Sequence, residues 1–205
     1  MPPRTLIAGL GNPGPKYERT RHNFGFMAAD ALLHAGHTGS TRQISMGKLG
    51  ELHALKLPGV EDDILVLKPM TYMNDSGFAV AHVLNYYKLS IDDVMVVHDE
   101  LDLPLGRMRM KKGGGLAGHN GLKSIAAQTG SQEFSRLRLG IGRPDGHMDV
   151  AAYVLQEFAA QERDAAHKVV QAAAAALRLY LLQGLDVAAT EAGQFTAVVP
   201  VGEQD

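Results

Sequence analysis

The chain has 205 residues, of which 45% are hydrophobic and 20% are charged, with a formal net charge of -2 and no cysteine. This size and composition predict a single globular core, and the lack of thiols excludes a disulfide framework, a thiolate nucleophile and a cysteine-based metal site. The N-terminal apolar run is too short for a signal peptide, and no window approaches the roughly 18 apolar residues of a membrane span, so we expect a cytoplasmic protein without a membrane partner.

Apolar runs and helical patterns alternate along the chain. The predicted strands are Thr5 to Leu10, Glu51 to Leu57, Asp63 to Lys68, Val94 to His98, Gly106 to Lys112 and Leu137 to Gly142. The predicted helices are Phe24 to Ala35, Asn74 to Lys88, Asn120 to Gln128 and Gln161 to Gln183. Continuous apolar runs such as DILVLK and DVMVVH are expected of strands covered on both faces. We therefore predict an α/β fold with a largely parallel central sheet, in one domain over residues 1–192, followed by a loosely ordered tail at 193–205.

The first strand leads into the pattern G-x-G-x-x-G at residues 9–14. A dinucleotide site would need a helix N-terminus directly after these glycines and an acidic residue about 20 positions later, at the end of a second strand. Prolines flank the last glycine instead, and Asp30 lies inside a helical pattern. We therefore interpret the motif as a rigid turn. It presents the polar side chains of Asn12, Tyr17, Arg19, Arg21, His22 and Asn23.

Polar side chains follow three of the predicted strands. Asn12 and His22 follow the first, Asn74 the third and Asp99 the fourth. Ligands of open α/β sheets bind beyond the carboxyl ends of the strands, so these side chains could share one cleft. A carboxylate at Asp99 bonded to one nitrogen of His22 would leave the other nitrogen to take a proton from water. Asn12, Asn74 or Asn120 could supply the amide donors that stabilise developing charge.

Other readings of these residues stay open. His22 could merely form a turn, and Asn74 could be a helix N-cap. Asp99 could belong to a carboxylate-rich metal site with His98, Glu100 and Asp102, although strand alternation would scatter these side chains over opposite faces. The stretch GGGLAGHNG could cradle a phosphate or be flexible punctuation before a helix. Phosphate-loop, helix-borne zinc and serine-elbow motifs are absent from the sequence.

The segment from Leu101 to Arg143 is basic, with eight basic residues against two acidic ones. The basic residues are Arg107, Arg109, Lys111, Lys112, Lys123, Arg136, Arg138 and Arg143. A basic face on an acidic body can bind a polyanion, but alternating charges are equally typical of the solvated face of an edge strand.

Four blocks in this order resemble bacterial peptidyl-tRNA hydrolases. They are GLGNPGPKYERTRHNFG, KPMTYMNDSG, HDELDLPLGRMRMKKGGGLAGHNGLKSI and RLRLGIGRP. The resemblance implies a monomeric, cytoplasmic enzyme with a twisted mixed sheet wrapped by helices. Such an enzyme hydrolyses the ester between a peptide and the terminal ribose of tRNA, with water and without a metal or other cofactor. Its partner is peptidyl-tRNA, held through the acceptor stem, the CCA end and the peptide.

The resemblance also implies roles for single residues. His22 matches the catalytic base and Asp99 the carboxylate that orients it. Asn12 and Asn74 match amides that hold the peptide and the attacked carbonyl, and Asn120 an amide nearer the tRNA end or the water. The cleft-lining and tRNA-contacting positions are matched by Tyr17, Tyr72, Met73 and Lys111, with Arg136, Arg138 and Arg143 in less certain register.

Two departures from the family pattern concern Tyr72, where phenylalanine is frequent, and Leu116 with Ala117, where glycine or another histidine is frequent. They bear on loop contacts around Gly113 to Gly118 and leave the predicted dyad intact. Two rival classes remain at this point: a non-catalytic tRNA-binding module with the same basic face, and a small-molecule hydrolase or nucleotide-binding enzyme built on the same sheet.

Overall fold

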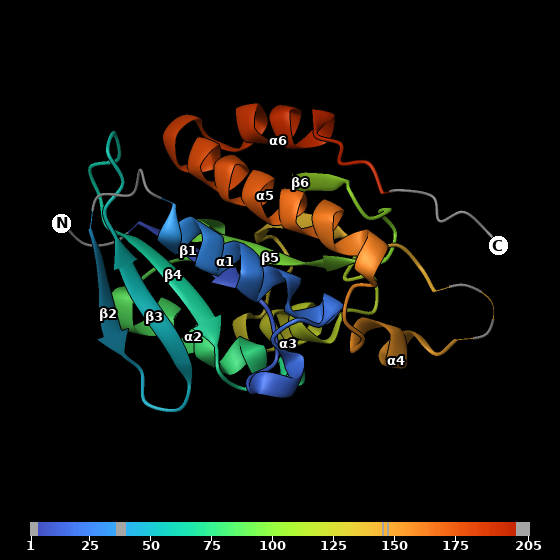
Figure 1. The fold of residues 1–205 in the computed structure, drawn as a ribbon. Coiled ribbons are helices and arrows are strands. Elements are labelled where there is room, and N and C mark those ends of the chain that lie inside the picture. Colours follow the sequence, from blue (N-terminus) through green and yellow to red (C-terminus); the bar gives the residue numbers. More distant parts are fainter. Residues whose placement is uncertain (1–3, 36–39, 145, 147, 200–205) are drawn as a thin grey trace.

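The computed structural model describes residues 4–35, 40–144, 146 and 148–199. Seven strands form one sheet in the order β2-β3-β4-β1-β5-β7-β6 (Figure 1). The strands are β1 (Thr5–Gly9), β2 (Thr41–Ser45), β3 (Gly50–Leu55), β4 (Ile64–Pro69), β5 (Val94–Glu100), β6 (Met108–Lys112) and β7 (Ser135–Gly140). The helices are α1 (Phe24–His34), α2 (Ser76–Tyr87), α3 (Asn120–Thr129), α4 (Val150–Val154), α5 (Arg163–Gln183) and α6 (Leu185–Gln194).

The centre of the sheet is parallel and its edges are antiparallel. β1 pairs in parallel with β4 and β5, and β5 with β7, whereas β2, β3 and β6 run antiparallel to their neighbours. This confirms the predicted α/β fold with a largely parallel sheet. β2 was not predicted, because its sequence TRQIS is mostly polar and exposed at the sheet edge.

Both faces of the central strands are covered, as their continuous apolar sequences indicated. On one face, Ile7 and Val97 belong to a core that includes side chains of α1 and α5. On the other, Leu6, Ala8 and Val96 belong to a second core that includes side chains of α2 and α3. Figure 1 shows the corresponding layers, with α1, α5 and α6 on one side of the sheet and α2 and α3 on the other. Burial on both faces is what makes alternating polarity unnecessary in β1 and β5.

The glycines after β1 serve close packing. A Cβ atom on Gly9 would lie 2.4 Å from the carbonyl oxygen of Gly25 in α1, and one on Gly25 would lie 2.2 Å from that of Val97. The chain then makes two 3-10 turns, η1 (Pro15–Tyr17) and η2 (Arg21–Asn23), before α1 begins at Phe24. The 3-10 turn η1 follows the glycines and α1 begins only at Phe24, so the α-helix that a dinucleotide fingerprint requires directly after them is not formed.

Some boundaries differ from those predicted. The helix expected from Asn74 begins at Ser76, because Met73–Asp75 form a separate 3-10 turn, η3, with Asp75 as the residue before α2. The short helix α4 was not predicted, since its five residues are too few for a helical period to show. Asn74 is therefore not the N-cap of α2.

The expected loose tail also needs correction. The limit at residue 192 falls inside α6, which ends at Gln194. Beyond it, the buried Ala197 donates its backbone N–H to the carbonyl of Gly106 at 2.9 Å, and Arg107 bonds to Thr196. These contacts attach the segment to the loop before β6. Residues 200–205 of the expected tail lie outside the described residues.

In the described part of the chain, none of the helices combines the length and the apolar character needed to cross a membrane.

Candidate active site

A cavity of about 520 Å³ lies where the carboxyl ends of the parallel strands meet. β1 leads to it through Asn12, β4 through Met73 and Asn74, and β5 through Asp99. Its walls contain six of the residues proposed from the sequence, namely Asn12, His22, Met73, Asn74, Asp99 and Asn120. Its further lining residues include His98, His119, Asp149, Val150, Ala151, Val154 and Leu155. Three strand ends far apart in the sequence thus converge, as expected.

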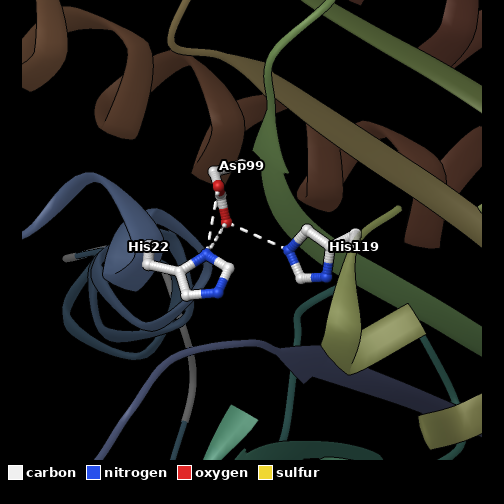
Figure 2. A group of neighbouring side chains, drawn as sticks. All are labelled: His22, Asp99 and His119. Carbon is white, nitrogen blue, oxygen red and sulfur yellow. Dashed lines mark hydrogen bonds and ion pairs between the residues drawn. The ribbon is translucent and has the colours of Figure 1, made fainter. Parts of the chain in front are cut away.

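His22 and Asp99 are in direct contact (Figure 2). The Nδ1 atom of His22 lies 3.0 Å from Oδ1 and 3.2 Å from Oδ2 of Asp99. Both residues are buried. An ionised carboxylate can only accept, so Nδ1 of His22 carries the proton and Nε2 keeps the free lone pair. The contact expected between these two residues is present.

His119 is a second histidine on Asp99, and it was missed in the sequence. Its Nε2 atom lies 3.1 Å from Oδ1 of Asp99. Its Nδ1 atom accepts the backbone N–H groups of Gly121 at 3.1 Å and Leu122 at 3.4 Å, which makes His119 the N-cap of α3. These bonds assign the proton of His119 to Nε2. The motif that contains His119 could be a phosphate loop or flexible punctuation before a helix, and nothing in its spacing pointed to Asp99, which lies 20 residues earlier.

The electrostatics of the group follow from these contacts. Burial opposes charging of His22, but the attraction and hydrogen bond of Asp99 outweigh it, so the pKa of His22 is raised above its ordinary value. Burial also opposes the charged form of Asp99 and would raise its pKa, but the two facing histidines lower this pKa well below the usual range. Asp99 therefore stays ionised wherever His22 titrates.

His22, Asp99 and His119 also meet the distance criterion for a metal site, since their ligand atoms lie within 4.8 Å of one another. Their hydrogen bonds do not suit a cation. With Nδ1 of His119 accepting backbone N–H groups, a metal on Nε2 would require an imidazolate. A metal on Nδ1 of His22 would place that ring's proton on Nε2 and remove the basic lone pair. The three side chains instead form two hydrogen bonds, in which His22 and His119 each donate one proton to the carboxylate of Asp99.

Asn12 is held in one orientation by its neighbours. Its Oδ1 accepts the backbone N–H of Met73 at 2.8 Å. Its own backbone N–H donates to Oδ1 of Asn23 at 2.8 Å, and its carbonyl accepts from Nδ2 of Asn23 at 3.0 Å. Because a backbone N–H is only a donor, the Asn12 amide cannot be flipped, and its NH₂ group remains to donate in the cavity.

Comparison with known proteins decides the family. The family model described as peptidyl-tRNA hydrolase matches residues 6–198. The chain belongs to the peptidyl-tRNA hydrolase family. The peptidyl-tRNA hydrolase of Solidesulfovibrio magneticus is 51% identical over 202 residues, covering 95% of each chain, and that of Oleidesulfovibrio alaskensis is 50% identical over 191 residues, covering 91% of this chain and 94% of the relative.

Solved structures agree. The crystal structure of peptidyl-tRNA hydrolase from Acinetobacter baumannii has a TM-score of 0.84 and 34% identity, covering 96% of this chain and 97% of that chain. The resemblance drawn from four sequence blocks is confirmed, and it extends to the region after Pro144, where the sequence showed only helical character.

In this member of the hydrolase family, the neighbouring residue Arg21 holds the turn that carries His22 in place. Nη2 of Arg21 pairs with Glu162 at 2.6 Å, and Nη1 donates to the carbonyl of Glu157 at 2.7 Å. The buried guanidinium also lies over the ring of Tyr153, 4.4 Å from its centre. These contacts tie the turn that carries His22 to the segment before α5.

Replacing Arg21 with methionine is expected to lower the free energy of unfolding by about 3 kcal/mol, because Glu162 keeps a mostly buried charge without its partner. Urea denaturation measures this. The control is Arg163→Met, which removes an exposed pair with Glu157 at 3.9 Å and should cost less than about 1 kcal/mol. Equal losses in the two variants would contradict a structural role specific to Arg21.

Three of the proposed substrate-binding residues lie outside the cavity. Tyr17 is half-buried in η1, beneath Lys16, whose Nζ atom lies 4.6 Å from the ring centre. Tyr72 is 58% exposed on the outer surface. Lys111 lies in the edge strand β6. Tyr17 follows Asn12 by five residues and Tyr72 directly precedes Met73, so closeness in the sequence does not bring them to the cavity wall.

The basic segment is less open than its charge count suggests. Arg138 pairs with Glu100 at 2.8 Å, Arg143 pairs with Asp102, and Arg136 is buried. Within the described residues, Lys111 and Lys123 have neither an ion pair nor a side-chain hydrogen bond. Burial and then the charges of Arg138 and Arg136 lower the pKa of Lys111. Like charges gathered around an unpaired ammonium favour an anionic ligand there.

The cavity has one wall that the sequence did not predict. It is lined by Asp149, Val150, Val154 and Leu155. Asp149 also caps α4, because its carboxylate accepts the N–H of Ala152 at 3.1 Å. Val150 and Leu155 are also partly open to solvent, with 40% and 44% exposure. This wall adds apolar side chains to a cleft that also contains amides.

Proposed function

We propose that the protein hydrolyses the ester that joins a peptide, or an N-blocked amino acid, to the terminal ribose of tRNA. The observation that carries the proposal is the His22–Asp99 contact at the wall of a cleft that also contains amide side chains. Family membership supplies the substrate class, and the site supplies a means of activating water. The protein acts as a monomer in the cytoplasm. Measuring the mass of the full chain in solution tests whether it is monomeric.

The reaction begins with a water molecule beside Nε2 of His22. His22 takes a proton from it as the hydroxyl oxygen bonds to the ester carbonyl carbon. Asp99 stabilises the imidazolium that forms and keeps the ring in the required tautomer. When the carbon–oxygen bond to the ribose breaks, the imidazolium returns the proton to the departing ribose oxygen. The peptide leaves as a carboxylic acid, and the tRNA is released.

Amide groups of the cleft act on the acyl part. The NH₂ group of Asn12 and the side chain of Asn74 hold the peptide backbone and the attacked carbonyl, next to the buried Met73. Asn120, at the start of α3, acts nearer the tRNA end or the water. An unblocked aminoacyl-tRNA keeps the ester carbonyl, but it has no amide carbonyl on its α-nitrogen for these donors to bind and carries a charged amine there instead. This difference makes the enzyme selective for peptidyl-tRNA.

The direct test is release of tRNA from N-acetylaminoacyl-tRNA, run beside the unblocked aminoacyl-tRNA, with and without a chelator. We expect cleavage of the blocked substrate alone, at the same rate with the chelator. Binding of tRNA without cleavage would favour a non-catalytic tRNA-binding module. Loss of activity with the chelator would contradict the metal-independent mechanism.

The tRNA is gripped by its phosphates around Lys111. Phosphate contacts are blind to base sequence, so tRNAs of different identity are accepted, and binding weakens as salt rises. In the variant Lys111→Met, we expect weaker tRNA binding and a smaller salt dependence, with the slope of log Kd against log salt reduced by about 0.9. Titrations at several salt concentrations measure it.

The matched control is Lys168→Met, which removes an exposed lysine of α5 that pairs with Asp164. Its salt slope should equal that of the unchanged protein. The same slope in Lys111→Met would place the tRNA contact elsewhere.

A further inference from the structure

Arg136 belongs to the basic segment, but its side chain does not face the solvent. It lies on β7 and is only 1% exposed. Its Nη1 donates to the carbonyl of Gly115 at 2.8 Å, and its Nη2 bonds to the carbonyls of Gly113 and Gly114. One guanidinium thus holds three consecutive carbonyl groups of a single loop.

These carbonyls are the main compensation for the buried charge. Arg138 has Glu100 and Arg143 has Asp102, but the described part of the chain offers Arg136 no carboxylate in direct contact. A buried guanidinium without hydrogen-bonding partners would be strongly unfavourable. Arg136 and the loop therefore depend on one another, and removing the guanidinium would leave three inward-facing carbonyls without a donor.

The loop connects the two halves of the proposed function. It starts beyond Lys111, at the end of β6, and ends at His119, which bonds to Asp99. Its backbone lies against Lys111, since a Cβ atom on Gly114 would come within 2.9 Å of the lysine Nζ. Gly113 and Gly114 have φ values of 63° and 92°, which glycine tolerates best. A shift of this loop would be passed on to both ends.

We propose that Arg136 is a positioning residue: by holding the carbonyls of Gly113, Gly114 and Gly115, it fixes the loop that places His119 and Asn120 against the site. It touches neither tRNA nor the reacting atoms. The expected effect of Arg136 on turnover rests on the proposed function. Its expected effect on the conformation of the loop does not depend on that function.

The experiment compares Arg136→Lys and Arg136→Met with the unchanged protein. Lysine keeps the charge but has one ammonium group, which cannot span three carbonyls, and methionine keeps much of the volume without charge. The controls are Arg42→Lys and Arg42→Met, at an exposed position in β2 at the opposite edge of the sheet. For each protein, kcat and KM on N-acetylaminoacyl-tRNA, the salt slope of tRNA binding, and hydrogen exchange of residues 113–118 are measured.

We expect both Arg136 variants to lose kcat roughly ten- to a hundredfold, the size of effect that small misplacement of catalytic groups produces, with a much smaller change in KM. Amides 113–118 should exchange at least about tenfold faster, because the loop opens more often. The salt slope should stay unchanged, since no phosphate contact is lost. The Arg42 variants should match the unchanged protein in all three.

Other results would overturn the inference. A salt slope reduced by about 0.9 in Arg136→Met would make Arg136 a phosphate ligand. Full activity in Arg136→Lys would show that charge alone is sufficient. Unchanged exchange of the loop would separate Arg136 from loop position even if Arg136→Met does not fold, because Arg136→Lys supplies the same measurement. If the unchanged protein does not cleave the ester, the proposed function fails, while the exchange result still decides the effect on the loop.

Discussion

Replacing His22 with alanine is expected to lower kcat on N-acetylaminoacyl-tRNA by about a hundred- to ten-thousandfold, the usual contribution of a general base. Nε2 of His22 is the basic atom that the contact with Asp99 leaves free, and alanine has no group to take its place. Affinity for tRNA should change little, because the proposed phosphate contacts lie around Lys111. Single-turnover cleavage and a separate binding titration measure the two effects.

The matched control for His22 is His82→Ala, at an exposed position of α2. It should retain normal turnover. Near-normal turnover in His22→Ala would remove His22 from the mechanism, and an equal loss of binding and turnover would indicate damage to the fold. A circular dichroism melt of both variants separates that last case from a catalytic effect.

Asp99→Asn is expected to have the second large effect, with kcat lowered at least about a hundredfold. Oδ1 of Asp99 accepts from both His22 and His119, so an asparagine oxygen would take that place. Its NH₂ group would then stand at the Oδ2 position, 3.2 Å from Nδ1 of His22. Nδ1–H of His22 would then face a donor as well as the remaining acceptor, which weakens the hold on the required tautomer. The neutral amide also lacks the charge that stabilises the imidazolium when His22 takes a proton.

The same variant should change the pH profile. His22 acts as a base only when neutral, so kcat/KM falls as pH drops through its pKa, which is raised above the ordinary histidine value in the unchanged protein. Removing the Asp99 charge removes the cause of that raised pKa, so the acid limb moves to lower pH. The control is Asp164→Asn, an exposed aspartate of α5. An acid limb that stays in place in Asp99→Asn would contradict the assignment.

The pattern of apolar residues along the chain was sufficient to predict the strands that are buried on both faces and the helices that bury one apolar stripe. The continuous apolar runs of β4 and β5 predicted buried parallel strands, and these strands occupy the centre of the sheet. β2 escaped prediction because an exposed edge strand needs no apolar residues and is held by its backbone pairing with β3. The short α4 escaped because the helical period cannot be read from five residues.

The candidate site was open to prediction where it follows parallel strands. Asn12, Asn74 and Asp99 stand at strand ends, and the rule that parallel strands end at one edge brings them together. His22 could be placed with them because a short turn leads from β1. Tyr17 and Tyr72 fell outside the cavity, since the side-chain directions in 3-10 turns and loops depend on backbone angles that their sequence does not specify.

By itself, the sequence determined the α/β architecture and the family, because these depend on local periodicity and on motif order. It predicted that His22 could pair with Asp99, and the contact itself is seen in the tertiary structure. The tertiary structure decided that His119 shares Asp99 and that Arg136 is buried beneath the glycine loop. Both contacts join residues about 20 positions apart, on elements whose relative placement depends on how β6, β7 and α3 pack. Charge and spacing along the chain do not contain that placement, since the same basic residue is stable either in water or among carbonyl groups that satisfy it.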